Sequence, residues 1–202
     1  MRSIQRITNL SFDTGGPMSE IRKLAPHRDE PATAAGRFLA KRGHVVMKQF
    51  REIGKVQCDY GTKLTFSTLV FAIAQGTKGD RTFGLKIEHE SQDGMEESCL
   101  VDFDELKELL LAIKYLLELA KRTAAERSDY AEFEYVTRDS LKVGFYQDTN
   151  GHQQAFFDVS PGGSMMFLDF DGLRKIFEQI KKGREYLIEK GAGVDAVVTQ
   201  EG

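Results

Sequence analysis

Two pairs of carboxylates with the same spacing are the first residues in this sequence that could do chemistry. They are Asp102 with Asp104 and Asp169 with Asp171, and a Phe separates the members of each pair. Two neighbouring carboxylates can act as general acid and base or hold a metal ion. Each pair, however, stands where a strand-like segment passes into a helix-like one, and a carboxylate there can accept the free amide hydrogens of the first helical turn. Helix capping is the favoured interpretation, and an enzyme that uses these pairs is the alternative.

Other side chains with catalytic or metal-binding potential are scattered. Cys58 and Cys99 lie in strand-like segments without CxxC spacing, so we expect two buried, reduced thiols. His89 and His152 are near strand ends, and their spacing does not indicate a metal pair. The sequence has no phosphate loop, nucleophile elbow, zinc-protease motif or dinucleotide fingerprint. We therefore expect no enzymatic activity, no cofactor and no metal site.

Charge and composition narrow the classes of function. The 202 residues carry a net charge of −3 and are 41% hydrophobic, which allows a substantial core but no global positive field that attracts nucleic acid. No apolar run approaches the roughly 20 residues that span a membrane, so we expect no membrane partner. Reduced cysteines favour the cytoplasm, while the N-terminal segment has no acid before Asp13 and leaves organellar import open.

The elements that must position these residues occur twice along the chain. Val101–Lys114, which includes the first Asp pair, recurs as Leu168–Lys181, a shift of 168 − 101 = 67 residues. Gln75–Gly79 recurs as Gln147–Gly151, a shift of 72, and a longer polar loop near Ser91–Glu97 accounts for the difference. This pattern predicts an internal duplication of one supersecondary unit, which must pack on its twin or on a partner to close a core.

Hydrophobic periodicity predicts the order β-β-β-β-α in each copy. The first copy has expected strands at Val56–Tyr60, Leu64–Gln75, Arg81–Glu90 and Glu97–Val101, then a helix that reaches Arg122. The second has expected strands at Phe133–Val136, Leu141–Gln147, His152–Val159 and Met165–Leu168, then a helix over Asp171–Lys190. We therefore predict an α+β fold of tandem β-β-β-β-α repeats, each an antiparallel four-stranded sheet with one covering helix.

The same pattern divides the chain into segments. Residues 1–35 are predicted to be a disordered N-terminal tail, and 36–54 an N-terminal extension that Val45-Val46 favours as strand and the apolar spacing favours as helix. The remaining segments are the first repeat at 55–122, a linker at 123–129, the second repeat at 130–190 and a C-terminal tail at 191–202. We expect the two repeats to form one intertwined domain.

The duplicated order over residues 55–190 resembles the single-stranded nucleic-acid-binding proteins of the Whirly and Pur-alpha type. Lys63–Val70 is similar to a lysine-rich stretch of Whirly proteins but lacks its glycine and small residues, and Lys142–Tyr146 resembles the aromatic signature of Pur repeats. The resemblance implies an intertwined module of two repeats. It also implies that unpaired bases lie on sheet faces with exposed aromatic and basic residues.

Side-chain alternation along the predicted strands identifies candidates for such a face. Tyr146 and Phe156 lie opposite the inward set of their strands, and each could stack a base for about 1–3 kcal/mol. Basic candidates for contacts to the nucleic-acid backbone are Lys63, Lys78, Arg81, Lys86, Arg138 and Lys142. Glu88, Glu90 and Asp158 share these strands and would repel phosphate. An ordinary solvated sheet face or a subunit interface is the alternative interpretation.

From these features we predict a non-enzymatic protein that binds single-stranded DNA or RNA across its sheets, as a homo-oligomer, in transcription or nucleic-acid maintenance. The alternative is a protein-interaction or scaffold module with the same fold. The acidic pI of 5.9 and the apolar strand face of Val70, Ala72 and Ala74 favour that alternative.

Overall fold

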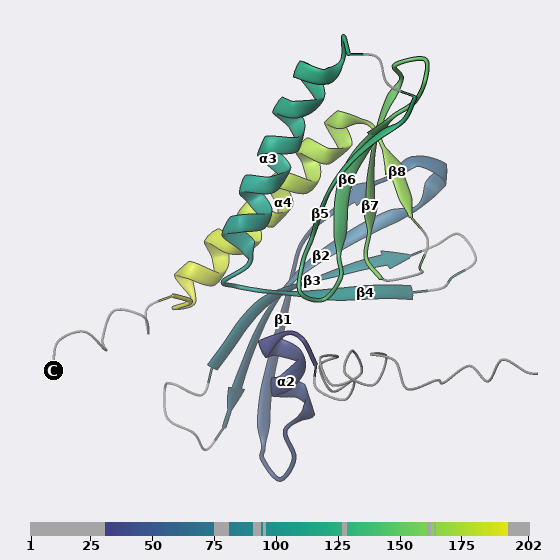
Figure 1. Ribbon diagram of the computed structural model, residues 1–202. Helices are drawn as coiled ribbons and strands as arrows, with labels where there is room; N and C mark the ends of the chain where they lie inside the picture. The colour runs from purple at the N-terminus through teal and green to yellow at the C-terminus, as the bar shows by residue number, and fades with distance from the viewer. Residues whose placement is uncertain are drawn as a thin grey trace, which may run out of the picture. The chain divides into compact units, whose positions relative to one another are not determined.

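The computed structural model describes residues 31–74, 81–90, 94, 96–126, 129–160, 163 and 165–193. In this part of the chain, two antiparallel four-stranded sheets and three α-helices form an α+β fold, as predicted (Figure 1). The elements follow in the order α2 (Ala34–Ala40), β1 (Val46–Gln57), the 3-10 turn η1 (Asp59–Gly61), β2 (Lys63–Ile73), β3 (Arg81–Glu90), β4 (Glu96–Asp102), α3 (Leu106–Thr123), β5 (Ala131–Val136), β6 (Lys142–Gln147), β7 (Gln153–Asp158), β8 (Met166–Leu168) and α4 (Phe170–Glu189).

Each sheet has its strands in sequence order, β1-β2-β3-β4 and β5-β6-β7-β8. All neighbours pair antiparallel, as in a meander. The first sheet is followed in the chain by α3 and the second by α4. Most of the predicted tails, residues 1–30 and 194–202, lie outside the described residues.

The first strand of the first sheet differs from the sequence prediction. The expected strand at Val56–Tyr60 is wrong, because β1 runs over Val46–Gln57 and residues 59–61 form the turn η1. A register shift between Glu52 and Gly54 breaks the in-out alternation of β1, which hides the strand from a period-two pattern. Residues 36–54 therefore hold both a helix and most of a strand, and β1 crosses the predicted boundary at residue 55.

The two long helices lie side by side along β5–β8 (Figure 1). Helix α3 packs on β5 and β6, which follow it in the chain, and α4 packs on β1, β2 and β3 as well as on β7 and β8. Each helix therefore covers strands from the other half of the chain. Apolar stripes on both helices, including Leu109, Ile113, Ile176 and Ile180, join one continuous core with the two sheets. Burial of these stripes is the main stabilising term for the helices.

Close approach of α4 to the first sheet depends on Gly183. A Cβ atom at this position would lie 2.7 Å from Cδ1 of Leu85 on β3, and 3.6 Å from Cγ2 of Thr68 on β2. The absence of a side chain lets the helix backbone lie directly on the strands. We call the face of each sheet toward the long helices its inner face and the opposite face its outer face.

Helix α2 covers part of the outer face of the first sheet. Phe38 stacks on Phe71 of β2 with ring centroids 5.8 Å apart, and Ala35 and Leu69 complete a small separate core cluster. The opposite side of β2 carries Val70, which belongs to the main core under the long helices. The apolar strand face predicted as a partner surface therefore contains a residue that is buried within the chain itself.

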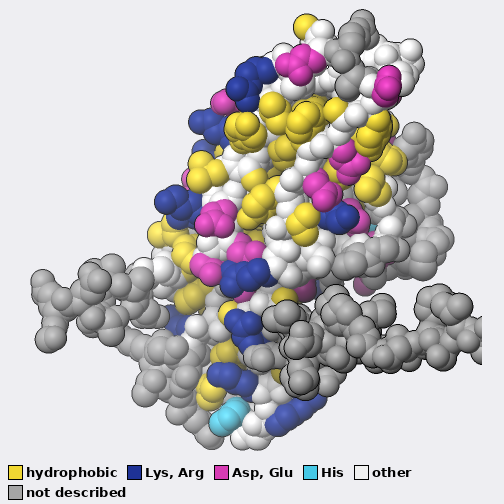
Figure 2. All heavy atoms as spheres, viewed as in Figure 1, with side chains coloured by type: hydrophobic (Ala, Val, Ile, Leu, Met, Phe, Trp, Pro, Cys, Tyr) yellow, Lys and Arg dark blue, Asp and Glu magenta, His cyan; other side chains and the backbone are white. Residues whose placement is uncertain are grey.

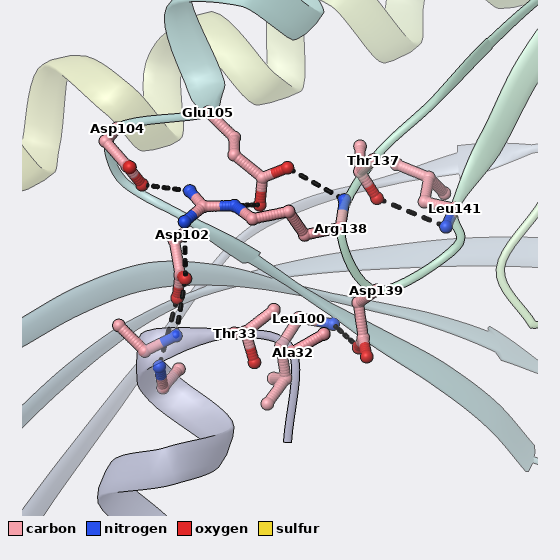
Figure 3. Close-up of polar contacts among 12 residues, drawn as sticks. Ala32, Thr33, Leu100, Asp102, Asp104, Glu105, Thr137, Arg138, Asp139 and Leu141 are labelled. Carbon is pink, nitrogen blue, oxygen red and sulfur yellow. Dashed lines mark hydrogen bonds and ion pairs between the residues drawn. The ribbon is translucent and has the colours of Figure 1, made fainter. Parts of the chain in front are cut away.

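Helix capping is confirmed for one of the two Asp pairs. Asp169 is the N-cap of α4 and accepts from the amide of Gly172 at 2.6 Å. Contrary to the prediction, Asp102 does not cap α3. It accepts instead from the amides of Ala34 and Ala35 at the start of α2, at 2.5 and 3.0 Å (Figure 3). The N-cap residue of α3 is Glu105, which makes no side-chain cap. A capping carboxylate thus comes to α2 from a strand far along the chain.

No helix among the described residues combines the length and the apolar character that crossing a membrane requires.

Candidate nucleic-acid interface

The predicted basic residues of the first sheet are mostly paired with carboxylates. Lys63 forms an ion pair with Glu90 on the neighbouring strand, and Lys86 pairs with Glu88 on its own strand. A hydrogen bond from Lys63 and its charge lower the pKa of Glu90. Arg81 is exposed at the start of β3, where its guanidinium lies 5.9 Å from the ring of Phe83. Lys78 lies outside the described residues.

Arg138 belongs to a charged cluster that joins the two halves of the chain (Figure 3). Its guanidinium contacts Asp104, lies 3.1 Å from Glu105 and 3.7 Å from Asp102, while its backbone amide donates to Glu105 at 2.9 Å. Partial burial lowers the pKa of Arg138, but the three carboxylates outweigh it and raise the pKa. With three carboxylates around one cation, the cluster is negative and does not favour phosphate.

The second sheet separates its two predicted stacking residues. Tyr146 is half-buried on the outer face and donates from Oη to Gln154 at 3.1 Å. Phe156 is only 1% exposed, and a Cβ at Gly144 on the neighbouring strand would lie 2.6 Å from its ring. Turn η1 lies against β8 on this side, where Gln154 also donates to Asp59 at 3.5 Å. Burial leaves Phe156 unable to stack on a base.

A row of three rings nevertheless crosses the outer face of the second sheet. Tyr130 and Tyr146 stack at 6.1 Å, and Tyr146 meets Phe167 edge-on at 6.1 Å. Carboxylates surround the row, since Tyr130 donates to Glu132 and Lys142 lies 3.8 Å from Glu134. Negative charge beside the rings opposes binding of a phosphate backbone.

A different surface, which the sequence interpretation missed, gathers three cations along one groove. Arg51 of β1 and Lys190, just beyond α4, both approach the ring of Tyr186, at 4.4 and 5.2 Å from its centroid. They border a groove of about 500 Å3 at the free edge of β1, called here the β1–α4 groove. No carboxylate is among the described residues that border it, which are Lys48, Gln49, Phe50, Arg51, Thr68, Val70, Tyr186 and Lys190.

Strand alternation distributes the β1 residues around the edge of the sheet. Arg51 pairs with Thr68 and lies on the inner face toward α4, whereas Lys48 and Phe50 pair with Phe71 and Leu69 and lie on the outer face. Phe50 is 57% exposed and touches Phe71 edge-on at 5.9 Å. Because β1 ends the sheet, cations of both faces and one exposed ring meet at the same free edge.

The neighbouring cations lower the pKa of Tyr186, in line with a positive field in the groove. A hydrogen bond from Arg51 is the main cause that lowers the pKa of this phenol, and the charges of Lys190 and Arg51 act in the same direction. A group of cations that stabilises a phenolate also stabilises a phosphate oxygen placed between them.

The surrounding segment is basic in sequence as well. Residues 37–55 contain six Lys and Arg side chains and one carboxylate, Glu52. Figure 2 shows Lys and Arg side chains gathered over the part of the molecule that holds α2 and the start of β1. This local excess was a usable sequence signal, whereas nothing in the sequence joins it to Tyr186 and Lys190 more than 130 residues later.

Among the predicted residues that the structure describes, Tyr146, Lys142 and the buried Phe156 share the outer face of the second sheet. Lys63, Lys86 and Arg138 lie in separate ion pairs, and Arg81 lies at an exposed strand end. No protein-family model and no curated protein sequence matches this chain, so the assignment of the site depends on the geometry and charge of the β1–α4 groove.

Proposed function

We propose that this protein is a non-enzymatic single-stranded nucleic-acid-binding protein whose binding site is the β1–α4 groove. The observation that carries the proposal is the meeting of Lys48, Arg51 and Lys190 around one free strand edge that also exposes Phe50. Single-strand binding combines cations that contact the backbone with an aromatic ring on which an unpaired base stacks. A duplex keeps its bases stacked internally and cannot use Phe50 in this way.

The arrangement of the two repeated units also supports the proposal, although it does not identify the binding residues. We infer that the two β-β-β-β-α units arose by duplication, because the repeated segments Val101–Lys114 and Leu168–Lys181 occupy matching places at the strand-to-helix junctions of β4–α3 and β8–α4. The exchange of helices between the halves suits the resemblance to Whirly and Pur-alpha proteins. Fold alone does not determine function, so the argument depends on the groove.

Fluorescence anisotropy with short single-stranded oligonucleotides at low salt tests the proposal. Three cations imply a slope of log K against log salt near −2, because each contact on a single strand contributes about −0.7. Arg51→Gln should weaken binding and reduce the slope by about 0.7. Lys55→Gln is the matched control, since Lys55 lies on the same strand but pairs with Glu52 at 3.3 Å, outside the groove.

Tyr146→Ala separates this site from the sheet face predicted at first. We expect it to leave the affinity unchanged, because the row of rings on the outer face of the second sheet lies among carboxylates. Lack of oligonucleotide binding at low salt, or equal losses in Arg51→Gln and Lys55→Gln, would reject the groove as a nucleic-acid site.

One observation favours the alternative of a protein-interaction module. Leu111 and Tyr115, one turn apart on α3, are 59% and 57% exposed. They lie on the helix that also borders a groove against Phe177 of α4, lined by Leu117 and by charged side chains of both helices. We propose that a second copy of this chain covers them, in line with the predicted homo-oligomer. Sedimentation of Leu111→Lys with Tyr115→Lys should then give a smaller species than the unmodified protein, and equal masses would reject this interface.

A further inference from the structure

The β1–α4 groove ends at a second hollow of opposite charge. The two hollows share Arg51 and Tyr186, and beyond them the second is bordered by Glu52, Glu185 and Glu189 with one cation, Lys182. A chain of phosphates that entered along Lys48 and continued past Tyr186 would meet these three carboxylates. Electrostatic repulsion therefore favours a nucleic-acid strand that stops at Arg51 over one that passes through.

The charge around Tyr186, where the groove meets the second hollow, also suits a terminal group. Arg51 and Lys190 lie 4.4 and 5.2 Å from the centroid of the Tyr186 ring, so two full positive charges and a phenol hydroxyl lie around one side chain. An internal phosphodiester carries one negative charge. A phosphate monoester carries about −1.5 to −2 near neutral pH and has three strong acceptor oxygens, which such a cluster of donors matches better.

From these two observations we propose that the β1–α4 groove binds the phosphorylated end of a single strand, with the terminal phosphate monoester between Arg51, Tyr186 and Lys190. The proposal rests on the proposed function and names its ligand class. The rest of the groove suits the attached nucleotide, since Gln49 offers an exposed polar side chain and Phe50 offers an exposed ring at the strand edge.

A set of oligonucleotides of one sequence tests the preference, each with an internal fluorophore. The set carries a 5′-phosphate, a 3′-phosphate, hydroxyls at both ends, or a closed circle without ends. We expect one phosphorylated form to bind at least about tenfold more tightly than the hydroxyl and circular forms, as an added charge-assisted contact would give. The comparison of the 5′ and 3′ forms identifies which end is bound.

Variants locate the preference within the groove. Arg51→Gln should remove the difference between phosphorylated and hydroxyl ends, and Tyr186→Phe should reduce it, while Lys55→Gln should keep it. Glu185→Gln with Glu189→Gln should raise the affinity for the circular strand, because it removes charge from the path beyond Tyr186. None of these side chains lies in the core, so loss of folding does not confuse the result.

The possible failures are distinct. Equal affinities for hydroxyl, phosphorylated and circular forms would overturn the end preference and leave the proposed single-strand binding intact. A preference that survives Arg51→Gln would place the terminal phosphate elsewhere and also overturn the inference. Absence of binding by every form would reject the proposed function itself.

Discussion

Tyr186 lies where two cations from different elements converge. Arg51 comes from β1 and Lys190 follows α4, and both lie over faces of the same ring. Such contacts hold the side chains in place before any ligand arrives, so less conformational freedom is lost on binding. The groove is therefore preorganised for an anion to the extent that these three residues keep their arrangement.

We expect the phenol of Tyr186 to ionise at lower pH than an ordinary tyrosine, because Arg51 donates to its oxygen and Lys190 lies close by. Arg51→Gln should move this pKa back toward its usual value of 10.0. An ultraviolet difference titration against the Tyr186→Phe variant isolates this one phenol. Lys55→Gln should leave the titration unchanged, and an unchanged curve in Arg51→Gln would show that the positive field has another source.

The two cysteines should make the fold sensitive to alkaline pH. Burial, reinforced by the charge of Asp59, raises the pKa of Cys58 from its usual 9.0 to about 11, and burial likewise raises the pKa of Cys99. A thiol that must stay neutral in the folded state contributes its full stability below about pH 9 and loses it as the pH rises through the folded pKa.

Urea unfolding at pH 8 and pH 10 measures this loss. The urea concentration at the midpoint should be lower at pH 10 than at pH 8 in the unmodified protein, and this decrease should be smaller in the double variant Cys58→Ala, Cys99→Ala. A thiol reagent at pH 8 should label neither cysteine in the folded protein and both after unfolding, since each thiol is buried. Rapid labelling of the folded state would mean that these strands open readily.

At the scale of elements, Asp102 connects three segments through one carboxylate. It accepts the first amides of α2, lies at the end of β4 and stands 3.7 Å from Arg138 of the β5–β6 turn. We expect Asp102→Asn to destabilise the fold by about 1–2 kcal/mol, because a charged cap becomes neutral in a buried place.

The matched control is Asp104→Asn. Its side chain is 72% exposed and contacts the same guanidinium, so its loss should change the free energy of unfolding by less than about 0.5 kcal/mol. Denaturant unfolding with extrapolation to water compares the two variants. Equal effects would mean that exposure does not distinguish the two carboxylates and that the α2 cap contributes little.

The sequence predicted elements whose pattern lies in contiguous residues and failed for features that depend on residues far apart in the chain. Strands β2 and β3 and both long helices were expected because their periodicity is a property of contiguous residues, as in Phe83, Leu85 and Ile87. Strand β1 was hidden by its register shift after Glu52. Helix α2 combines a local cap, Thr33, with a carboxylate more than 60 residues away. Phe156 is buried although strand alternation correctly places it on the outer face.

The candidate site could not be predicted from the sequence because it joins segments that are far apart in the chain. Residues 37–55 show an excess of cations, but a groove forms only where α4 crosses β1. Of the seven residues predicted to bind nucleic acid that the structure describes, none borders that groove. Strand alternation distinguishes one face from the other but does not reveal which neighbouring carboxylates neutralise Lys63, Lys86 or Arg138.

At the scale of the whole molecule, the exchange of helices ties the two halves into one cooperative unit. Helix α4 packs on β1–β3 as well as on β7 and β8, and α3 packs on β5 and β6. The first half alone therefore lacks the helix that covers β1–β3, and the second half alone lacks the helix that covers β5 and β6. We expect residues 31–126 and 129–193, produced separately, to show no cooperative unfolding by circular dichroism. The full chain should unfold in one transition with coincident far-ultraviolet and fluorescence signals.

Mixing the two fragments provides the complementary measurement. The mixture should regain a cooperative transition, since all contacts of the core except one connection are restored. A fragment that folds stably alone would show that the exchanged helices are not needed to complete either half.

Because α4 crosses β1, residues from both halves of the chain line the groove. Arg51 and Phe50 are supplied by one, and Tyr186 and Lys190 by the other. A chain severed between Glu126 and Asp129 would thus carry half of the proposed binding site on each piece, and retention of an oligonucleotide would report reassembly. Damage that prevents either half from folding would abolish the proposed site even when none of the residues in the groove has changed.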